Sequence, residues 1–230
     1  MIFVSLRFFL GALLLLWIPR LWLRRGLARL RPRRRQSGKN PLITEPWRER
    51  EPGDPQINFR VEFTKGVNYL DLFRAGFGGW LLWGGWGLPP ALGVAEGAPP
   101  GMTGAALALR GLVLLAGLLI QTVRPEKERL SFFPPIFYLA GLSIALCDFR
   151  GAAFAFTLIW AVNPSLPNAR AFLSIYAMLM MVFGRFFDGA GMQSLLLAAG
   201  LTFLPVLLSL LANRPLTVFA RRTHHTGARP

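Results

Sequence analysis

The sequence is poor in the side chains that bind metals and cofactors. Its 230 residues include one cysteine, Cys147, and two histidines, His224 and His225. A single cysteine excludes an intrachain disulfide. Histidines that lie only in the polar C-terminal stretch, outside every apolar run, exclude an intramembrane haem with two histidine ligands and disfavour a histidine-rich metal site. We therefore expect no metal and no cofactor.

Charged residues are also scarce, at 16% of the chain against 53% hydrophobic residues. A soluble domain usually carries about a quarter charged residues. The apolar residues come in runs long enough to span lipid, and a bilayer core about 30 Å thick needs roughly 20 helical residues, because lipid cannot bond unpaired backbone amides. The sequence therefore predicts an all-α, polytopic transmembrane helix bundle.

The charges that are present are mostly basic, and the net charge is +15. Arginines placed directly after an apolar run usually hold that end of the span in the cytoplasm and contact anionic lipid headgroups. We expect this role, with the bilayer and its headgroups as partners, rather than binding of nucleic acid. The eight arginines in question follow residues 1–19: Arg20, Arg24, Arg25, Arg29, Arg31, Arg33, Arg34 and Arg35.

The two ends of the chain predict opposite sides of the membrane. Residues 1–19 are expected to form an uncleaved transmembrane anchor with its N-terminus outside, because the positive charge follows the apolar run and no A-x-A-like cleavage site is present. Residues 20–74 form a basic juxtamembrane arm with a polar linker. Residues 213–230 form a basic cytoplasmic tail, disordered near its end.

One segment departs from the helical pattern. Within residues 56–65, Ile57, Phe59, Val61 and Phe63 alternate with polar residues, and this period of two predicts a short cytoplasmic β-strand. A lone strand is not stable in water. Two interpretations stay open: the four apolar side chains rest on the protein's own helices, or they dock on a partner protein.

Glycine and tryptophan gather in the second predicted span, residues 75–94, which follows a juxtamembrane helix over residues 67–74 where Asp71 and Arg74 can pair. Small residues let helices approach closely in lipid, and tryptophans at this spacing share a face. We predict a helix-packing surface, with a stacking surface for lipid, quinone or pigment as the alternative. Its residues are Gly78, Gly79, Trp80, Trp83, Gly84, Gly85 and Trp86.

Further apolar runs complete a bundle over residues 75–212. A third span is expected over residues 103–123, and two hairpins over 131–147 with 151–163 and over 171–187 with 192–212. Two hairpins leave the C-terminal arginines in the cytoplasm, as the positive-inside rule requires, and give seven membrane segments, with five or six as the alternative. Residues 151–163 make only about 20 Å of helix, which predicts a re-entrant or strongly tilted hairpin.

Five charges lie in or beside these predicted spans. A charge inside a bilayer costs at least ~2.5–3.5 kcal/mol on insertion scales, so each needs a reason to be there. If the hairpin turns reach the interface, their charges are solvated caps. If the turns dip toward the midplane, the charges form an ionic cluster or an ion-binding site. The residues are Arg110, Asp148, Arg150, Arg185 and Asp188.

Three functions fit these features. The favoured one is a non-catalytic subunit, scaffold or assembly factor of a membrane complex, with other membrane subunits as partners. A transporter of a small solute or ion, using the charges of the hairpin turns, is the first alternative. A membrane enzyme acting on a lipid-linked substrate is the second, and we assign no catalytic residue. The short loops and the arginine bias favour a bacterial inner membrane.

Overall fold

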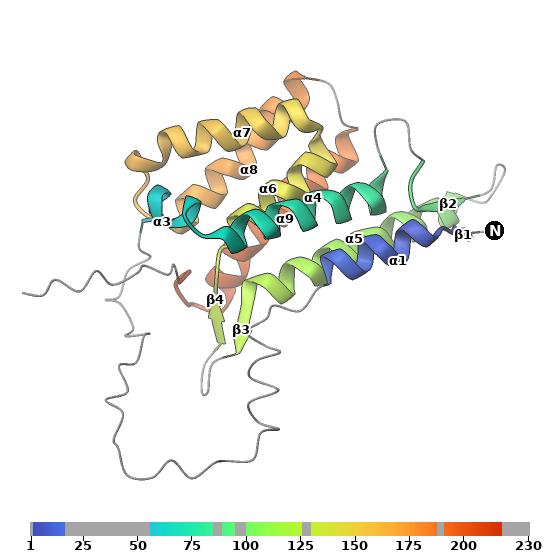
Figure 1. Cartoon of the computed structure of the whole chain (residues 1–230), viewed down its shortest axis with the longest axis horizontal. Helices are drawn as coiled ribbons and strands as arrows, with labels where there is room; N and C mark the ends of the chain where they lie inside the picture. The colour runs from blue at the N-terminus through green and yellow to red at the C-terminus, as the bar shows by residue number, and fades with distance from the viewer. Residues whose placement is uncertain are drawn as a thin grey trace, which may run out of the picture.

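The computed structural model describes residues 2–16, 56–84, 89–94, 100–125, 130–187 and 191–217. The described residues are mostly helical, which confirms the all-α part of the prediction (Figure 1). Its elements are β1 (Ile2–Val4), α1 (Leu6–Leu15), α3 (Phe59–Phe63), α4 (Gly66–Trp83), β2 (Leu92–Val94), α5 (Pro100–Thr122), β3 (Val123–Pro125), β4 (Leu130–Phe132), α6 (Ile136–Cys147), α7 (Phe149–Val162), the 3₁₀ turn η1 (Asn163–Ser165), α8 (Ala169–Phe186) and α9 (Met192–Leu211).

Among the described residues, seven helices of ten or more residues run in alternating directions between two ends of the bundle. At one end, which we call the Asp148 end, α1 and α5 begin, α4 ends, and Asp148 joins α6 to α7 (Figure 1). The Ser5 amide there donates to Ala91 O at 3.1 Å, and the Ala91 amide donates to Leu82 O at 3.3 Å. The adjoining strands β1 and β2 pair antiparallel.

The opposite end, which we call the Gln56 end, is where α1, α5, α7 and α9 finish and α4, α6 and α8 begin. The β3–β4 hairpin follows α5, and the Phe133 amide donates to Thr122 O at 2.8 Å. The Thr217 amide donates to Phe132 O at 2.8 Å, which brings the end of the described chain to the same place.

Helix α6 is the centre of the bundle. Ten of its 12 residues are buried, and it runs parallel to α4. The two backbones touch, because a Cβ at Gly141 would overlap Leu72 O and lie 2.7 Å from Gly76 N. The buried Ser143 Oγ and Tyr176 OH lie 3.0 Å apart and join α6 to α8.

Helix α4 differs from its prediction. Residues 67–74 and the first half of the predicted span over 75–94 form one helix, Gly66–Trp83, so the predicted boundaries are wrong. The helix ends because Gly84 has a φ of 84°, and Pro89 and Pro90 beyond it lack amide donors. The predicted pair between Asp71 and Arg74 is confirmed, at 2.7 Å.

The predicted strand within residues 56–65 is also wrong, because Phe59–Phe63 is a short α-helix. Asn58 caps it, its Oδ1 accepting from the Val61 amide at 3.3 Å. Phe59 and Phe63 are four residues apart, a spacing that puts them on one side of either a strand or a helix. Their rings stack at 4.3 Å between centroids. An alternation this short therefore did not distinguish a strand from a helix.

Three helices are long and apolar enough to cross a membrane: α5 over Gly101–Thr122, α8 and α9. They match the spans predicted over 103–123, 171–187 and 192–212. Seven full crossings are not confirmed. Helices α1, α6 and α7 have 10, 12 and 14 residues, and at 1.5 Å per residue none of them reaches the roughly 30 Å of a bilayer core.

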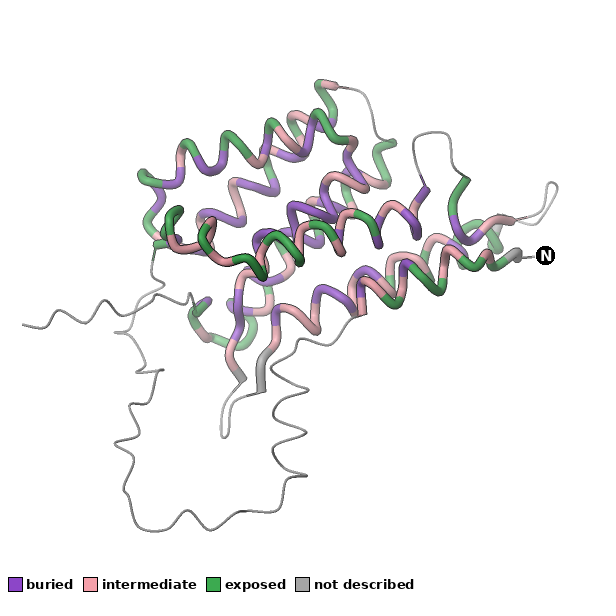
Figure 2. The backbone as a smooth tube through the Cα atoms, in the orientation of Figure 1, coloured by how far each residue is buried: buried purple, intermediate pink, exposed green. Residues whose placement is uncertain are grey.

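The outer surface of the bundle is apolar. Large hydrophobic side chains that are at least a third exposed occur along every long helix apart from the central α6. Figure 2 shows how exposed and buried positions are distributed along the helices. Leu112 on α5, Phe154 on α7 and Leu210 on α9 are each more than half exposed. Such a surface would associate or aggregate in water, whereas hydrocarbon solvates it. The structure therefore supports a membrane protein.

Candidate functional site

An aromatic groove lies between α3 and α7 near the Gln56 end. Its volume is about 380 Å³. The ring of Phe63 is central to its floor, 5.1 Å from the ring of Trp160 and 5.1 Å from that of Phe137 between centroids, both edge to face. Such pairs add to the stability gained by burial alone. The groove is lined by Phe59, Phe63, Phe156, Thr157, Trp160 and Ala161.

Helix α3 is fixed over α7 by two amide side chains. Gln56 Nε2 lies 3.0, 3.0 and 3.1 Å from the carbonyl oxygens of Asn163, Pro164 and Leu166, so its two N–H groups are shared among three acceptors. In return, Asn163 Nδ2 donates to Ile57 O at 2.8 Å. The Ile57 side chain is 2% exposed. Five helical residues are far too few for a helix that is stable alone, so these bonds define the wall of the groove.

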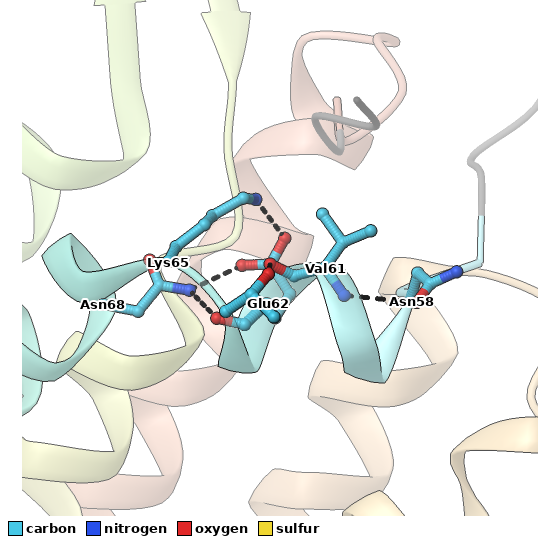
Figure 3. Close-up of polar contacts among 6 residues, drawn as sticks. Asn58, Val61, Glu62, Lys65 and Asn68 are labelled. Atoms are coloured by element: carbon cyan, nitrogen blue, oxygen red, sulfur yellow. Dashed lines mark hydrogen bonds and ion pairs between the residues drawn. The ribbon is translucent and has the colours of Figure 1, made fainter. Parts of the chain in front are cut away.

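The junction between α3 and α4 is held by the Glu62 side chain (Figure 3). Lys65 Nζ lies 2.6 Å from Glu62 Oε1, and Asn68 Nδ2 donates to Glu62 Oε2 at 2.7 Å. Asn68 Nδ2 also donates to the Glu62 carbonyl at 2.8 Å. Both carboxylate oxygens of Glu62 therefore have a partner, Lys65 on one and Asn68 on the other. These contacts fix the angle between α3 and α4, and therefore the opening of the groove.

Two buried polar atoms near the groove lack hydrogen-bond partners among the described residues. They are Trp160 Nε1, a donor, and Asn163 Oδ1, an acceptor. The two residues lie one turn apart, and Trp160 is 8% exposed. An unsatisfied buried group costs roughly 1–3 kcal/mol. Of the two residues, Trp160 lines the groove.

The predicted charges of the hairpin turns lie at the Asp148 end. Asp148 makes the whole connection between α6 and α7, and its Oδ2 accepts from the Arg150 amide at 3.3 Å. Arg150 and Arg185 are exposed. The two turns are close, because a Cβ at Gly151 would lie 3.0 Å from Gly184 Cα. The fifth charge, Asp188, lies outside the described residues.

Arg110 is engaged elsewhere. Its guanidinium carbon lies 4.8 Å from the centroid of the Trp83 ring, and Nη1 donates to Trp83 O at 3.5 Å. Nε donates to Ala106 O at 3.4 Å. Arg110 therefore binds the C-terminal end of α4, where helix carbonyls favour a cation. Within the part of the chain that the structure describes, these contacts of Arg110 involve neither hairpin turn.

The predicted helix-packing residues fall at several places. A Cβ at Gly78 would lie 3.0 Å from Leu15 Cγ on α1, and one at Gly79 would lie 2.9 Å from Ala145 Cβ on α6. The ring of Trp83 lies under the Arg110 guanidinium. The partly buried Trp80 has its ring 5.6 Å from that of Phe77. Gly84 ends the helix. Gly85 and Trp86 lie outside the described residues.

The eight arginines of the predicted lipid-contacting arm, Arg20 to Arg35, also lie outside the described residues. The two described residues that flank the arm, Leu16 and Gln56, are both at the Gln56 end. The Tyr138 hydroxyl, at the start of α6, donates to Leu15 O at 3.2 Å and fixes this position.

Of the four predicted docking side chains, Ile57 is buried in the protein's own fold, Phe59 is 50% exposed, and Val61 and Phe63 are intermediate. Sequence reasoning missed Trp160 and Asn163, which α3 needs. Their signal was an indole and an amide one turn apart at the end of an apolar run.

The described residues contain no group of three or more His, Cys, Asp or Glu side chains placed to hold a metal ion. Comparison with protein-family models, with curated proteins and with solved structures finds no significant match for this chain.

Proposed function

We propose that the protein is a non-catalytic subunit or scaffold that assembles with other membrane proteins. The observation that carries this proposal is the exposed N-terminal half of α5. Of the apolar window in α5, 22% is buried by the chain's own fold, against 39% for α8 and 44% for α9. A span that its own protein leaves so open has room for a neighbouring helix.

The exposed face of α5 has the composition of a helix contact in lipid. Gly101, Ala105 and Ala108 are exposed at helical spacing, and nothing lies within 4 Å of a Cβ built at Gly101 or at the nearby Gly104. Small residues allow close backbone approach, which supplies the van der Waals contact that drives helix association in membranes. A lipid-facing helix with no partner has no comparable use for them.

The proposed orientation has the Gln56 end in the cytoplasm. Every undescribed segment that contains lysine or arginine, namely 17–55, 126–129 and 218–230, joins the described chain at the Gln56 end. Segments 85–88, 95–99 and 188–190 join at the Asp148 end and contain neither residue. The positive-inside rule supports this orientation. We also propose seven membrane segments, a re-entrant α6–α7 hairpin and a bacterial inner membrane.

Photo-crosslinking tests the scaffold proposal. A photoreactive residue at Ala108 should crosslink to a second protein in intact membranes, and mild detergent extraction with mass spectrometry should identify that chain. A photoreactive residue at Leu207 on α9 is the matched control, since it is exposed but lies among large side chains. Adducts with lipid alone at both positions, together with a monodisperse single-chain species, would overturn the proposal.

The transporter alternative is favoured by one observation, the backbone of Asp148. Its φ of 72° and ψ of 151° are almost confined to glycine in proteins. Such conformations cost about 1–3 kcal/mol and gather at functional sites. Asp148→Asn keeps a side-chain acceptor for the Arg150 amide and removes the charge, so a transporter should lose uptake while its thermal stability is unchanged. Full uptake by Asp148→Asn and by Asp188→Asn would eliminate this alternative.

A further inference from the structure

The aromatic groove faces the phase that surrounds the bundle. Phe59 on one wall is half exposed, and Thr157 and Ala161 on the other are exposed. Phe154 and Leu158 continue the exposed apolar side of α7. A volume of about 380 Å³ lies within the range of roughly 300–1,000 Å³ that is usual for ligand sites. An occupant must therefore be largely apolar and must enter from the side.

The walls of the groove are fixed before anything binds. The shared donation of Gln56 to three carbonyls and the return bond from Asn163 to Ile57 hold α3 against the end of α7. A ligand that enters a preformed slot does not have to order the protein, so more of its contact energy appears as affinity. Aromatic walls also suit a flexible chain, because they offer large flat contact areas at low entropic cost.

The surroundings of the groove favour a ligand with negative charge. Arg60 lies next to Phe59, is exposed, and forms no ion pair among the described residues. The acid nearest in sequence, Glu62, is already occupied by Lys65 and Asn68. Trp160, which lines the groove, has a buried Nε1 without a hydrogen-bond partner among the described residues. Near the Gln56 end, an apolar slot is therefore accompanied by an exposed cation, Arg60, which follows the lining residue Phe59 in the chain.

We infer that this groove binds an anionic phospholipid, with one acyl chain against Phe63 and Trp160 and the phosphate beside Arg60. The inference rests on the proposed membrane placement, which sets the Gln56 end at the level of the lipid headgroups. Trp160 contributes its ring to the slot, because tryptophan presents a large apolar surface to a hydrocarbon chain. The negative lipids of a cytoplasmic leaflet would supply this ligand.

Native mass spectrometry of the full chain, purified in mild detergent and loaded with phosphatidylglycerol or phosphatidylcholine, tests the inference. The unmodified protein should retain one phosphatidylglycerol molecule about fivefold better than phosphatidylcholine, since one arginine near an anionic surface contributes that order of preference. Arg60→Gln should abolish the preference. Arg150→Gln is the matched control, an exposed arginine at the opposite end of α7, and should retain it.

A second pair of variants tests the apolar slot. Ala161→Trp fills the groove from an exposed position and should lower retention of both lipids about tenfold, an effect typical of a lost buried chain contact. Leu158→Trp changes a residue of α7 outside the groove and should leave retention unchanged. Equal retention by Arg60→Gln and the unmodified protein, or full retention by Ala161→Trp, would overturn the inference.

A failure of the lipid site can be distinguished from a failure of the proposed scaffold function. If alkaline extraction releases the protein from membranes, the membrane placement fails. If Ala108 crosslinks to no protein while the lipid preference follows Arg60, the scaffold proposal fails and the lipid site stands.

Discussion

Helices α5 and α6 are both apolar, but they differ in how far the protein's own fold buries them. Helix α6 has 12 residues, ten of them buried, and is enclosed by its neighbours. Helix α5 has 23 residues, and its N-terminal half exposes mostly small or apolar side chains. Apolar composition alone therefore does not tell a helix enclosed by its own protein from one that faces lipid or a partner. The difference lies in which glycines touch a neighbouring backbone.

The glycines of the two helices show that difference directly. A Cβ at Gly141 on α6 would overlap the backbone of α4, whereas nothing lies within 4 Å of a Cβ at Gly104 or Gly111 on α5. The C-terminal half of α5 resembles α6, since a Cβ at Gly117 would lie 2.9 Å from Leu15 O. Helix α5 is thus anchored at the Gln56 end and open toward the Asp148 end.

The largest effect is expected from Gly141→Val. The added side chain cannot avoid Leu72 O, and backbone cannot move aside as a flexible side chain can, so we expect a loss of about 3 kcal/mol or more. Gly104→Val is the matched control and should leave stability unchanged. Thermal unfolding in detergent, followed by circular dichroism, measures both. Equal midpoints for the two variants would show that α4 and α6 are not in backbone contact.

The long apolar helices are the part of the fold that the sequence allowed us to predict. Runs that stop at a charged or polar residue, namely Arg124, Asp188 and Asn213, set the C-terminal bounds of α5, α8 and α9 to within a few residues. Helix α4 was predicted poorly, because its first turns carry Asn68, Asp71 and Arg74 and read as a surface segment, while its true end depends on the φ of Gly84. The pairing of β1 with β2 joins segments nearly 90 residues apart and left no local signal.

The aromatic groove was only half predictable. The alternation of apolar residues singled out Phe59 and Phe63, although the strand inferred from it was wrong. Phe156 and Trp160, about 100 residues later, are ordinary members of an apolar run until tertiary structure brings them to α3. The local sequence pattern therefore identified the wall of the groove that α3 forms, but it gave no information about the wall that α7 forms.

A smaller effect is expected from Arg110→Met, which tests how α5 is held near its open half. The substitution keeps the apolar stem but removes the cation over Trp83 and the bond to Trp83 O. We expect a loss of about 1 kcal/mol, together with faster backbone hydrogen exchange in residues 100–110 but not in α6. Leu109→Met, at an exposed neighbour, is the control. Exchange that quickens equally in α6 would mean that the two helices are not independently held.

The smallest effect is expected from Tyr176→Phe, on the enclosed side of the comparison. The Ser143 hydroxyl donates to Ala140 O at 2.8 Å, so the Tyr176 hydroxyl is the donor in the 3.0 Å contact with Ser143. Removing it costs a hydrogen bond but leaves no donor unsatisfied, because Ser143 keeps its own acceptor. Bonds of this kind between membrane helices average about 0.6 kcal/mol. Ser143→Ala should cost more than Tyr176→Phe, because it leaves the buried Tyr176 hydroxyl without its acceptor. The double variant should cost less than the sum of the two single losses, because both variants lose the same bond. A double variant whose loss equals the sum of the two single losses would show that the two hydroxyls act separately and that no hydrogen bond between them joins α6 to α8.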